Sequence, residues 1–230
     1  MPARYSCQQE FYPGRDLTFQ QVYIILRTSL NPVYLKLLRV NNFSSEPSLR
    51  PGRFFLTARI RKPRRFDLIS YRAILPLKGI TILTHRLCGM PGDTLEIKAG
   101  VLYVNGQDVD RELALKHIFK IAAPDSVDIV YDQKQAYTIP PYTNTLYISL
   151  EDAYVSKLGA NWERYVLPPG LRDDEIFLTY KKNWNRDNFG PVRVTEGRWF
   201  VLGDNRGNSR DSRYLGLIEQ RRFVGTVIWK

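Results

Sequence analysis

The sequence GDNRGNSRDSRYLG, residues 203–216, lies between two apolar runs at residues 199–202 and 223–228. It combines three glycines, three arginines and two aspartates with serine and asparagine side chains. A loop this polar packs against a core only when its groups satisfy one another, as Asp–Arg pairs do, and glycine permits turns with positive φ. The flanking runs predict strands, and the segment between them is either a well-bonded surface turn or a structured site.

Further strand-like segments precede this loop, each bounded by glycine or proline. They are residues 54–60, 67–71, 81–88, 94–97 and 101–104. Alternating or β-branched runs of this length are typical of antiparallel strands, and the last two segments predict a hairpin. An aromatic content of 13% also favours strands over a helical bundle. The sequence therefore predicts a mainly β fold.

Composition changes along the chain and suggests three parts. Residues 1–39 form an N-terminal segment without a recognisable motif, whereas residues 40–106 and 199–230 form the predicted β core. Residues 107–198 contain two Pro-Pro pairs and a predicted helix around residues 150–159. This middle part is predicted to be an inserted small subdomain, rich in β structure.

The N-terminal segment shows no membrane span. Residues 17–38 have the pattern of one or two amphipathic helices, and their best apolar run, residues 22–26, is short. A transmembrane helix needs roughly 20 apolar residues. We therefore expect no transmembrane span, and no cleavable leader either, because the first 20 residues hold no continuous apolar core.

The net charge of +11 is unevenly distributed, since residues 59–65 hold five cations. Such a run is a solvated loop, or it binds an anionic membrane surface or nucleic acid. The sequence holds no nucleic-acid-binding motif and no metal-ligand spacing, so the membrane surface is the better partner. Two cysteines, Cys7 and Cys88, are too few for a disulfide framework, and no phosphate-binding glycine loop is present. No metal or organic cofactor is expected.

Four segments of the sequence form an ordered set of motifs. They are SSEPSLRPG at 44–52, RFDLISY at 65–71, HRLCGMPGD at 85–93 with its extension at 102–106, and the loop at 203–216. In this order they resemble the signature segments of type I signal peptidases, the serine endopeptidases that remove secretory leader peptides. The first resembles Ser-Met-x-Pro-Thr-Leu followed by Gly-Asp, and the third resembles Lys-Arg-Val-x-Gly-x-Pro-Gly-Asp. A weaker likeness, at residues 184–191, is to the Bacteroides-like branch of the family.

The resemblance implies an antiparallel, β-barrel-like catalytic core at the extracytoplasmic face of the bacterial plasma membrane. The expected reaction is cleavage of N-terminal signal peptides from secreted proteins after a small residue. Because no span is seen, attachment to the membrane is expected to be peripheral. The register of Pro47 makes Ser44 the nucleophile, although a serine ahead of a proline is otherwise most often a turn residue.

The expected general base departs from the bacterial pattern. His85 stands where bacterial members carry lysine, and the endoplasmic-reticulum and archaeal branch of the family uses Ser-His. A free histidine, with a pKa near 6.5, is mostly neutral at pH 7 and accepts a serine proton directly. We therefore expect activity to rise through pH 6–7. The alternative is a catalytically inactive paralogue that binds leader peptides by strand addition.

The remaining site residues also follow from the resemblance. Ser209 matches the serine that hydrogen-bonds the base, and intact Arg86 follows His85. Asp211 either pairs with Arg213 or orients the His85 ring, and the sequence leaves both open.

Three further residues are expected to meet the substrate. Asn42 stands at the position of the second oxyanion donor, and it is otherwise a turn asparagine. Ser45 replaces a methionine that shapes the pocket for the small residue before the scissile bond. Ser45 and Leu49 are the expected substrate-binding residues.

Overall fold

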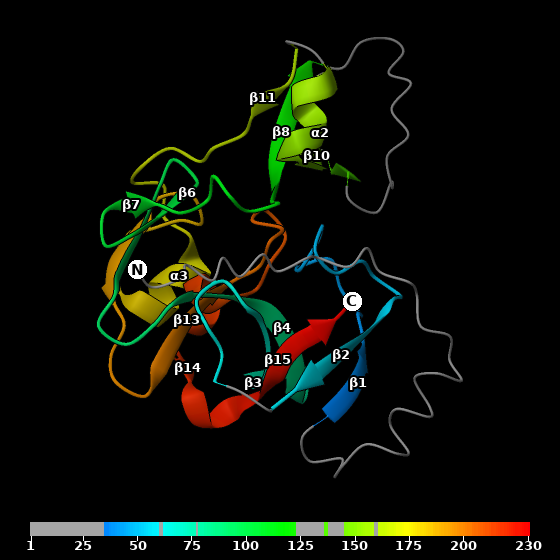
Figure 1. Ribbon diagram of the computed structural model, residues 1–230. Helices are drawn as coiled ribbons and strands as arrows, with labels where there is room; N and C mark the ends of the chain where they lie inside the picture. Colours follow the sequence, from blue (N-terminus) through cyan, green and yellow to red (C-terminus); the bar gives the residue numbers. More distant parts are fainter. Residues whose placement is uncertain (1–34, 60–61, 77, 123–135, 138–144, 159–160) are drawn as a thin grey trace, which may run out of the picture.

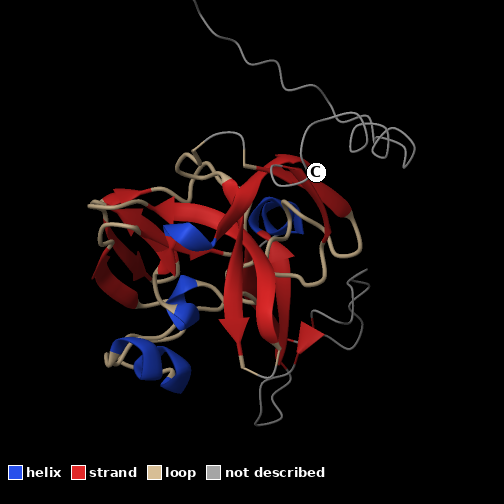
Figure 2. Cartoon of the chain, turned by 90° about the horizontal axis from the view of Figure 1, so that it is seen from below, coloured by secondary structure: helices blue, strands red, loops and turns tan. Residues whose placement is uncertain are grey.

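A computed structural model describes residues 35–59, 62–76, 78–122, 136–137, 145–158 and 161–230. Figure 1 shows a strand-rich body with a smaller lobe, and Figure 2 shows that the helices are short and peripheral. Every named strand pairs antiparallel to its neighbours. The prediction of a mainly antiparallel β fold is confirmed.

The largest sheet has seven strands and unites the two ends of the described chain. Its C-terminal strand β15 lies between β2 and β3, so residues far apart in sequence form one surface. The sheet is open in its hydrogen bonding, because the edge strands β1 and β14 do not pair with each other. In spatial order the strands are β1 (Leu35–Arg39), β2 (Phe54–Ala58), β15 (Phe223–Trp229), β3 (Leu68–Leu75), β4 (Gly79–Gly89), β13 (Arg198–Leu202) and β14 (Ile218–Glu219).

A second sheet of four strands packs beside the first. The predicted hairpin is present, with Leu95 opposite Val104. Ile176 of helix α3 (Asp174–Tyr180), which Asp173 caps, is buried in the same apolar cluster as Leu95. The strands are, in spatial order, β12 (Phe189–Arg193), β5 (Thr94–Lys98), β6 (Val101–Val104) and β7 (Gln107–Asp108). Two short helices, α4 (Ser212–Leu215) and η2 (Gln220–Arg222), lie between β13 and β15.

The third sheet forms the smaller lobe (Figure 1). It has its own apolar cluster, which includes Ile148 and Val155. Helix α2 (Asp152–Leu158) lies where the sequence predicted one. The strands are β11 (Glu163–Arg164), β8 (Lys116–Ala122), β10 (Thr145–Glu151) and β9 (Ala136–Tyr137).

The start of strand β8 attaches this lobe to the core. The Lys116 N–H donates to Asp204 O at 2.9 Å, and the Lys116 carbonyl accepts from Arg206 N at 2.8 Å. The Lys116 ammonium lies 2.8 Å from Glu46 Oε2, and both residues are buried. The lobe is therefore tied to two loops of the core by main-chain bonds and an ion pair.

The structure differs from the sequence prediction at the N-terminal side. Residues 35–38, predicted as the end of a helix, form strand β1, while residues 1–34 lie outside the described part of the chain. Leu37 pairs with Leu56 of β2, and the tertiary pairing overrides the helical spacing. Strand β1 thus adds residues that precede residue 40 to the core sheet. Strand β12 and helix α3 also pack on core strands, although both fall within residues 107–198. None of the described helices is long and apolar enough to cross a membrane.

Candidate active site

Ser44 and His85 lie together at the edge of the large sheet. Ser44 belongs to the loop between β1 and β2, and His85 lies within β4. The distance between Ser44 Oγ and His85 Nε2 is 3.2 Å, within hydrogen-bond reach. Ser209 Oγ lies 3.4 Å from the same nitrogen. Three segments predicted from sequence therefore meet at one imidazole nitrogen.

Gly203 allows the loop of residues 203–216 to approach Ser44. A Cβ atom at Gly203 would lie 2.4 Å from Ser44 O and 2.2 Å from Ser209 Oγ, which is closer than atoms can pack. Ser44 O also accepts from Asn205 N at 3.1 Å. The absence of a side chain at residue 203 is thus a condition for the contact between the loop and Ser44.

Arg86 holds the loops around the site without contacting Ser44. Its guanidinium forms a two-point contact with Asp204, with Nε–Oδ1 at 2.6 Å and NH2–Oδ2 at 2.5 Å. It also donates to Phe66 O at 2.7 Å and to Ser48 Oγ at 3.0 Å. Successive residues of a strand point to opposite faces, so Arg86 serves the loops on the face opposite His85.

Asp211 and Arg213 form a fully buried ion pair. Asp211 is 0% exposed and Arg213 is 1% exposed. The Asp211 carboxylate accepts from Arg213 Nε at 2.9 Å, from Arg213 NH2 at 2.8 Å and from Gly203 N at 3.0 Å. Arg213 also donates to the carbonyls of Arg186 and Arg206. Of the two arrangements left open for Asp211, the structure has the one in which it pairs with Arg213.

Tyr71 provides the contact to the other imidazole nitrogen, and the sequence analysis did not assign it a role. Its hydroxyl lies 2.8 Å from His85 Nδ1, and both side chains are buried. Strand β3 pairs with β4 so that Ile69 is opposite His85, which places Tyr71 one diagonal step away. The segment RFDLISY contained this tyrosine, but only the strand register reveals its partner.

Burial sets the protonation of this pair. The apolar surroundings lower the pKa of His85 to about 4, and the negative charges of Asp211 and Asp204 oppose only part of that shift. Burial also raises the pKa of Tyr71, so its hydroxyl stays protonated. Burial therefore places the pKa of His85 below the value of the free side chain, on which the expected pH dependence was based, because the sequence does not show that this histidine is buried.

Asn42 contacts Ser44 through its side-chain oxygen. Asn42 Oδ1 accepts from the Ser44 N–H at 3.1 Å and from the Ser44 hydroxyl at 2.8 Å. The expected role was donation from the Asn42 amide to an oxyanion. That role requires the carboxamide to leave the position it has in this structure.

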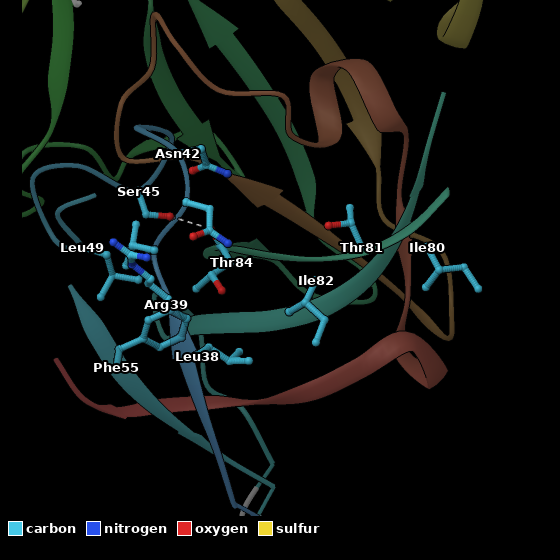
Figure 3. A pocket seen from close by; sticks show the side chains of 12 residues that line it. Leu38, Arg39, Asn42, Ser45, Leu49, Phe55, Ile80, Thr81, Ile82 and Thr84 are labelled. Carbon is cyan, nitrogen blue, oxygen red and sulfur yellow. Dashed lines mark hydrogen bonds between the residues drawn. The ribbon is translucent and has the colours of Figure 1, made fainter. Parts of the chain in front are cut away.

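A pocket of about 350 Å³ is lined by Ser45, the residue that follows Ser44 (Figure 3). Ser45 and Leu49, the expected substrate-binding residues, both line it, and Asn42 forms part of its wall. The Ser45 hydroxyl donates to Thr84 O at 2.5 Å, so its polar group is bonded within the wall. Sequence reasoning missed five other apolar lining residues, which are Leu38, Val40, Phe55, Ile80 and Ile82.

Metal chemistry has no candidate centre in the described part of the chain. Across those residues, no group of three or more histidine, cysteine, aspartate or glutamate side chains could hold a metal ion. Cys88 is buried, and burial raises the pKa of its thiol to about 12. The groups that remain for chemistry are therefore the hydroxyls and the imidazole described above.

Comparison with known proteins identifies relatives over most of the chain. The family described as "Signal peptidase, peptidase S26" matches residues 17–230. A signal peptidase I of Bacillus amyloliquefaciens is 33% identical over 88% of this chain and 75% of its own length. Signal peptidase I T of Bacillus subtilis is 29% identical over the same shares. A solved signal peptidase I from Enterococcus faecalis is 24% identical and matches 73% of this chain and 97% of its own, with a TM-score of 0.35.

The buried ion pair predicts a large loss of stability on removal of its acid. We expect Asp211→Ala to lower the free energy of unfolding by about 3–5 kcal/mol, because Arg213 would remain buried without its counter-charge. Urea denaturation measures this change. Asp174→Ala is the control, since Asp174 pairs with Arg172 at the surface with its side chain 81% exposed. Equal, small losses in both variants would contradict a structural role for the buried pair.

Proposed function

Because the chain belongs to the signal peptidase family, peptidase S26, and is therefore a serine endopeptidase, we propose that it removes N-terminal signal peptides from secreted preproteins. In this proposal Ser44 is the nucleophile, His85 is the general base, and cleavage follows a small residue. The contact of 3.2 Å between Ser44 Oγ and His85 Nε2 carries the proposal. Both residues are buried beside an open pocket, which suits a reaction that must exclude bulk water.

The proposed reaction follows the ordinary order of acyl transfer. Neutral His85 accepts the Ser44 proton at Nε2 while Oγ attacks the peptide carbonyl carbon. The Ser44 backbone N–H donates to the oxyanion that forms. Protonated His85 then gives its proton to the leaving amine, and a water activated by the same nitrogen releases the acyl group.

The shape beside the dyad supports binding of an extended peptide. Strand β4 pairs with β3 along residues 79–86, while β13 pairs with β4 only from Arg86 onward. The part of β4 before His85 therefore has an edge to which a peptide strand can add. Ile80, Ile82 and Thr84 of this part line the pocket, which would receive the side chains of the leader (Figure 3).

We further propose that the protein acts at the extracytoplasmic face of the bacterial plasma membrane and binds its anionic surface peripherally. Within residues 59–65, Ile60 and Arg61 lie outside the described residues, and Arg65 pairs with Asp93 at 2.7 Å. Among the described residues of this run, Arg59, Lys62 and Arg64 are exposed, and their positive charges support surface binding.

Replacement of either dyad member tests the mechanism. We expect Ser44→Ala and His85→Ala each to lower kcat/KM for a leader peptide by about 10⁴-fold or more, because each removes a group that acts in every turnover. Ser156→Ala, in the exposed part of α2, is the control. The measurement is cleavage of a synthetic preprotein fragment, read by mass spectrometry. Full activity in either alanine variant would remove that residue from the mechanism, and a wild type that binds but never cuts would favour the inactive paralogue.

The pKa of His85 predicts an acidic limb of the pH profile. The base must be unprotonated, so kcat/KM should rise with pH through about 4 and stay level from pH 6 to 8. The protein also loses stability as pH falls from the unfolded value near 6.5 towards 4, because unfolding lets His85 take a proton. Circular dichroism at each pH therefore accompanies the kinetics. A midpoint at pH 6–7 in protein that is still folded would contradict the effect of burial.

Vesicle binding tests the membrane proposal. Each cation near an anionic surface contributes about 1 kcal/mol, so neutralising three of them should weaken binding by about a hundredfold. The test variant replaces Arg59, Lys62 and Arg64 by glutamine, and sedimentation with anionic and neutral vesicles is compared across a salt series. The control replaces three exposed arginines elsewhere, Arg111, Arg172 and Arg221. Equal binding to both vesicle types, insensitive to salt, would leave residues 59–65 as a solvated loop.

A further inference from the structure

We propose that Asn42 is a positioning residue that keeps the site in a resting state, in which the Ser44 proton points away from His85 until a peptide displaces the Asn42 carboxamide. This inference rests on the proposed roles of Ser44 and His85. It follows from the direction of each hydrogen bond in a network that links four side chains, which are Asn42, Ser44, His85 and Tyr71.

The Ser44 backbone N–H fixes the donor-to-acceptor direction of the hydrogen bonds in this network. A backbone N–H can only donate, so the Asn42 atom 3.1 Å from it must be the carboxamide oxygen. That oxygen can only accept, and it lies 2.8 Å from Ser44 Oγ. The hydroxyl of Ser44 therefore gives its single proton to Asn42.

The same reasoning identifies which nitrogen of the His85 imidazole carries the proton. Ser44 Oγ has given its proton to Asn42, so the contact at 3.2 Å is a bond that His85 Nε2–H donates to it. Ser209 Oγ, at 3.4 Å, is a second acceptor for that N–H. A neutral histidine protonated at Nε2 has a lone pair at Nδ1, which accepts the Tyr71 hydroxyl proton at 2.8 Å. Each donor that takes part in this hydrogen-bond network has an acceptor in this arrangement.

This resting arrangement cannot attack a peptide. Nε2 carries a proton and is no base, and the Ser44 N–H that an oxyanion would use is bonded to Asn42. Asn42 is exposed, however, so its carboxamide can turn into solvent without opening the core. A peptide carbonyl that approaches Ser44 competes for the same N–H and removes Asn42 from it.

The change conserves protons. Once Asn42 has moved, the Ser44 hydroxyl turns to Nε2 and the neutral ring changes tautomer, so that one proton leaves Nε2 and one is taken up at Nδ1 with no change in net charge. Because Nδ1 is buried against Tyr71, this exchange with water takes place when a local opening of the site lets water reach the ring. The Tyr71 hydroxyl turns from donor to acceptor in the same step. The dyad is then in the form that the proposed reaction requires.

Nitrogen NMR tests the resting state without any substrate. The chain has only two histidines, so labelling histidine with ¹⁵N gives a simple spectrum that a His117→Gln variant assigns. We expect wild-type His85 at pH 7 to be protonated at Nε2 and unprotonated at Nδ1. In Asn42→Ala the Ser44 proton loses its acceptor, and the population should shift towards Nδ1–H. A wild-type ring already protonated at Nδ1 would overturn the proposal, whether or not the protein cleaves peptides.

Kinetics separate this role from that of an oxyanion donor. For a resting-state latch, Asn42→Ala should raise kcat/KM by about 2–10-fold, mainly through KM, because the peptide no longer competes with one or two neutral hydrogen bonds. Asn42→Asp, whose carboxylate binds the same donors more tightly, should lower kcat/KM. Asn161→Ala, at an exposed turn outside the site, is the matched control. A fall in kcat of about 10²-fold or more in Asn42→Ala, with KM unchanged, would identify an oxyanion donor and overturn the latch.

Discussion

The ion pair between Asp211 and Arg213 allows a strongly polar loop to lie against Ser44. Two charges without solvent are costly unless their hydrogen bonds are complete, and here the carboxylate also accepts from Gly203 while the guanidinium reaches two carbonyls. The pair therefore fixes Gly203, whose missing side chain makes room for Ser44 and Ser209. The geometry around His85 therefore depends on the hydrogen bonds that this ion pair makes within the loop, and not only on the contacts of the imidazole itself.

A neutral environment around His85 is the second organising constraint. A carboxylate at Nδ1 would stabilise the imidazolium and raise its pKa, whereas the Tyr71 hydroxyl adds no charge. The nearest acids, Asp211 and Asp204, are each paired with an arginine. Burial is therefore the largest influence on the pKa of His85, and it keeps the imidazole neutral at ordinary pH. A lysine at this position would also have to be buried to be neutral. Whichever residue stands here, its protonation state depends on its burial.

The residues that meet at His85 could be selected from sequence because the resemblance to the family covers the segments that carry them. The resemblance selects Ser44 by the register of Pro47, and it matches Asp211 to an acid that pairs with the nearby Arg213. Tyr71 could not be predicted, because its partner depends on the register between two strands. The pKa of His85 depends on tertiary packing, which no short motif records. The direction of the Asn42 carboxamide is set locally, by the Ser44 N–H two residues later, but the motif left its role as a donor or an acceptor open. In the fold, the strands and the hairpin followed from periodicity, while residues 35–38 became strand β1 because a partner strand was available.

The attachment of strand β8 limits how this architecture can vary in length. Lys116 bonds through its main chain to Asp204 and Arg206, and through its side chain to Glu46, two residues after Ser44. Strand β10 also reaches this loop, since Ser149 Oγ donates to Asn205 Oδ1 at 2.9 Å. The small lobe is thus joined to the loops around Ser44 through both β8 and β10. Evolution or protein engineering can change the length of the lobe without disturbing those loops only outside these two strands. A deletion that includes Lys116 would leave Glu46 and the main chain of the loop of residues 203–216 without these partners.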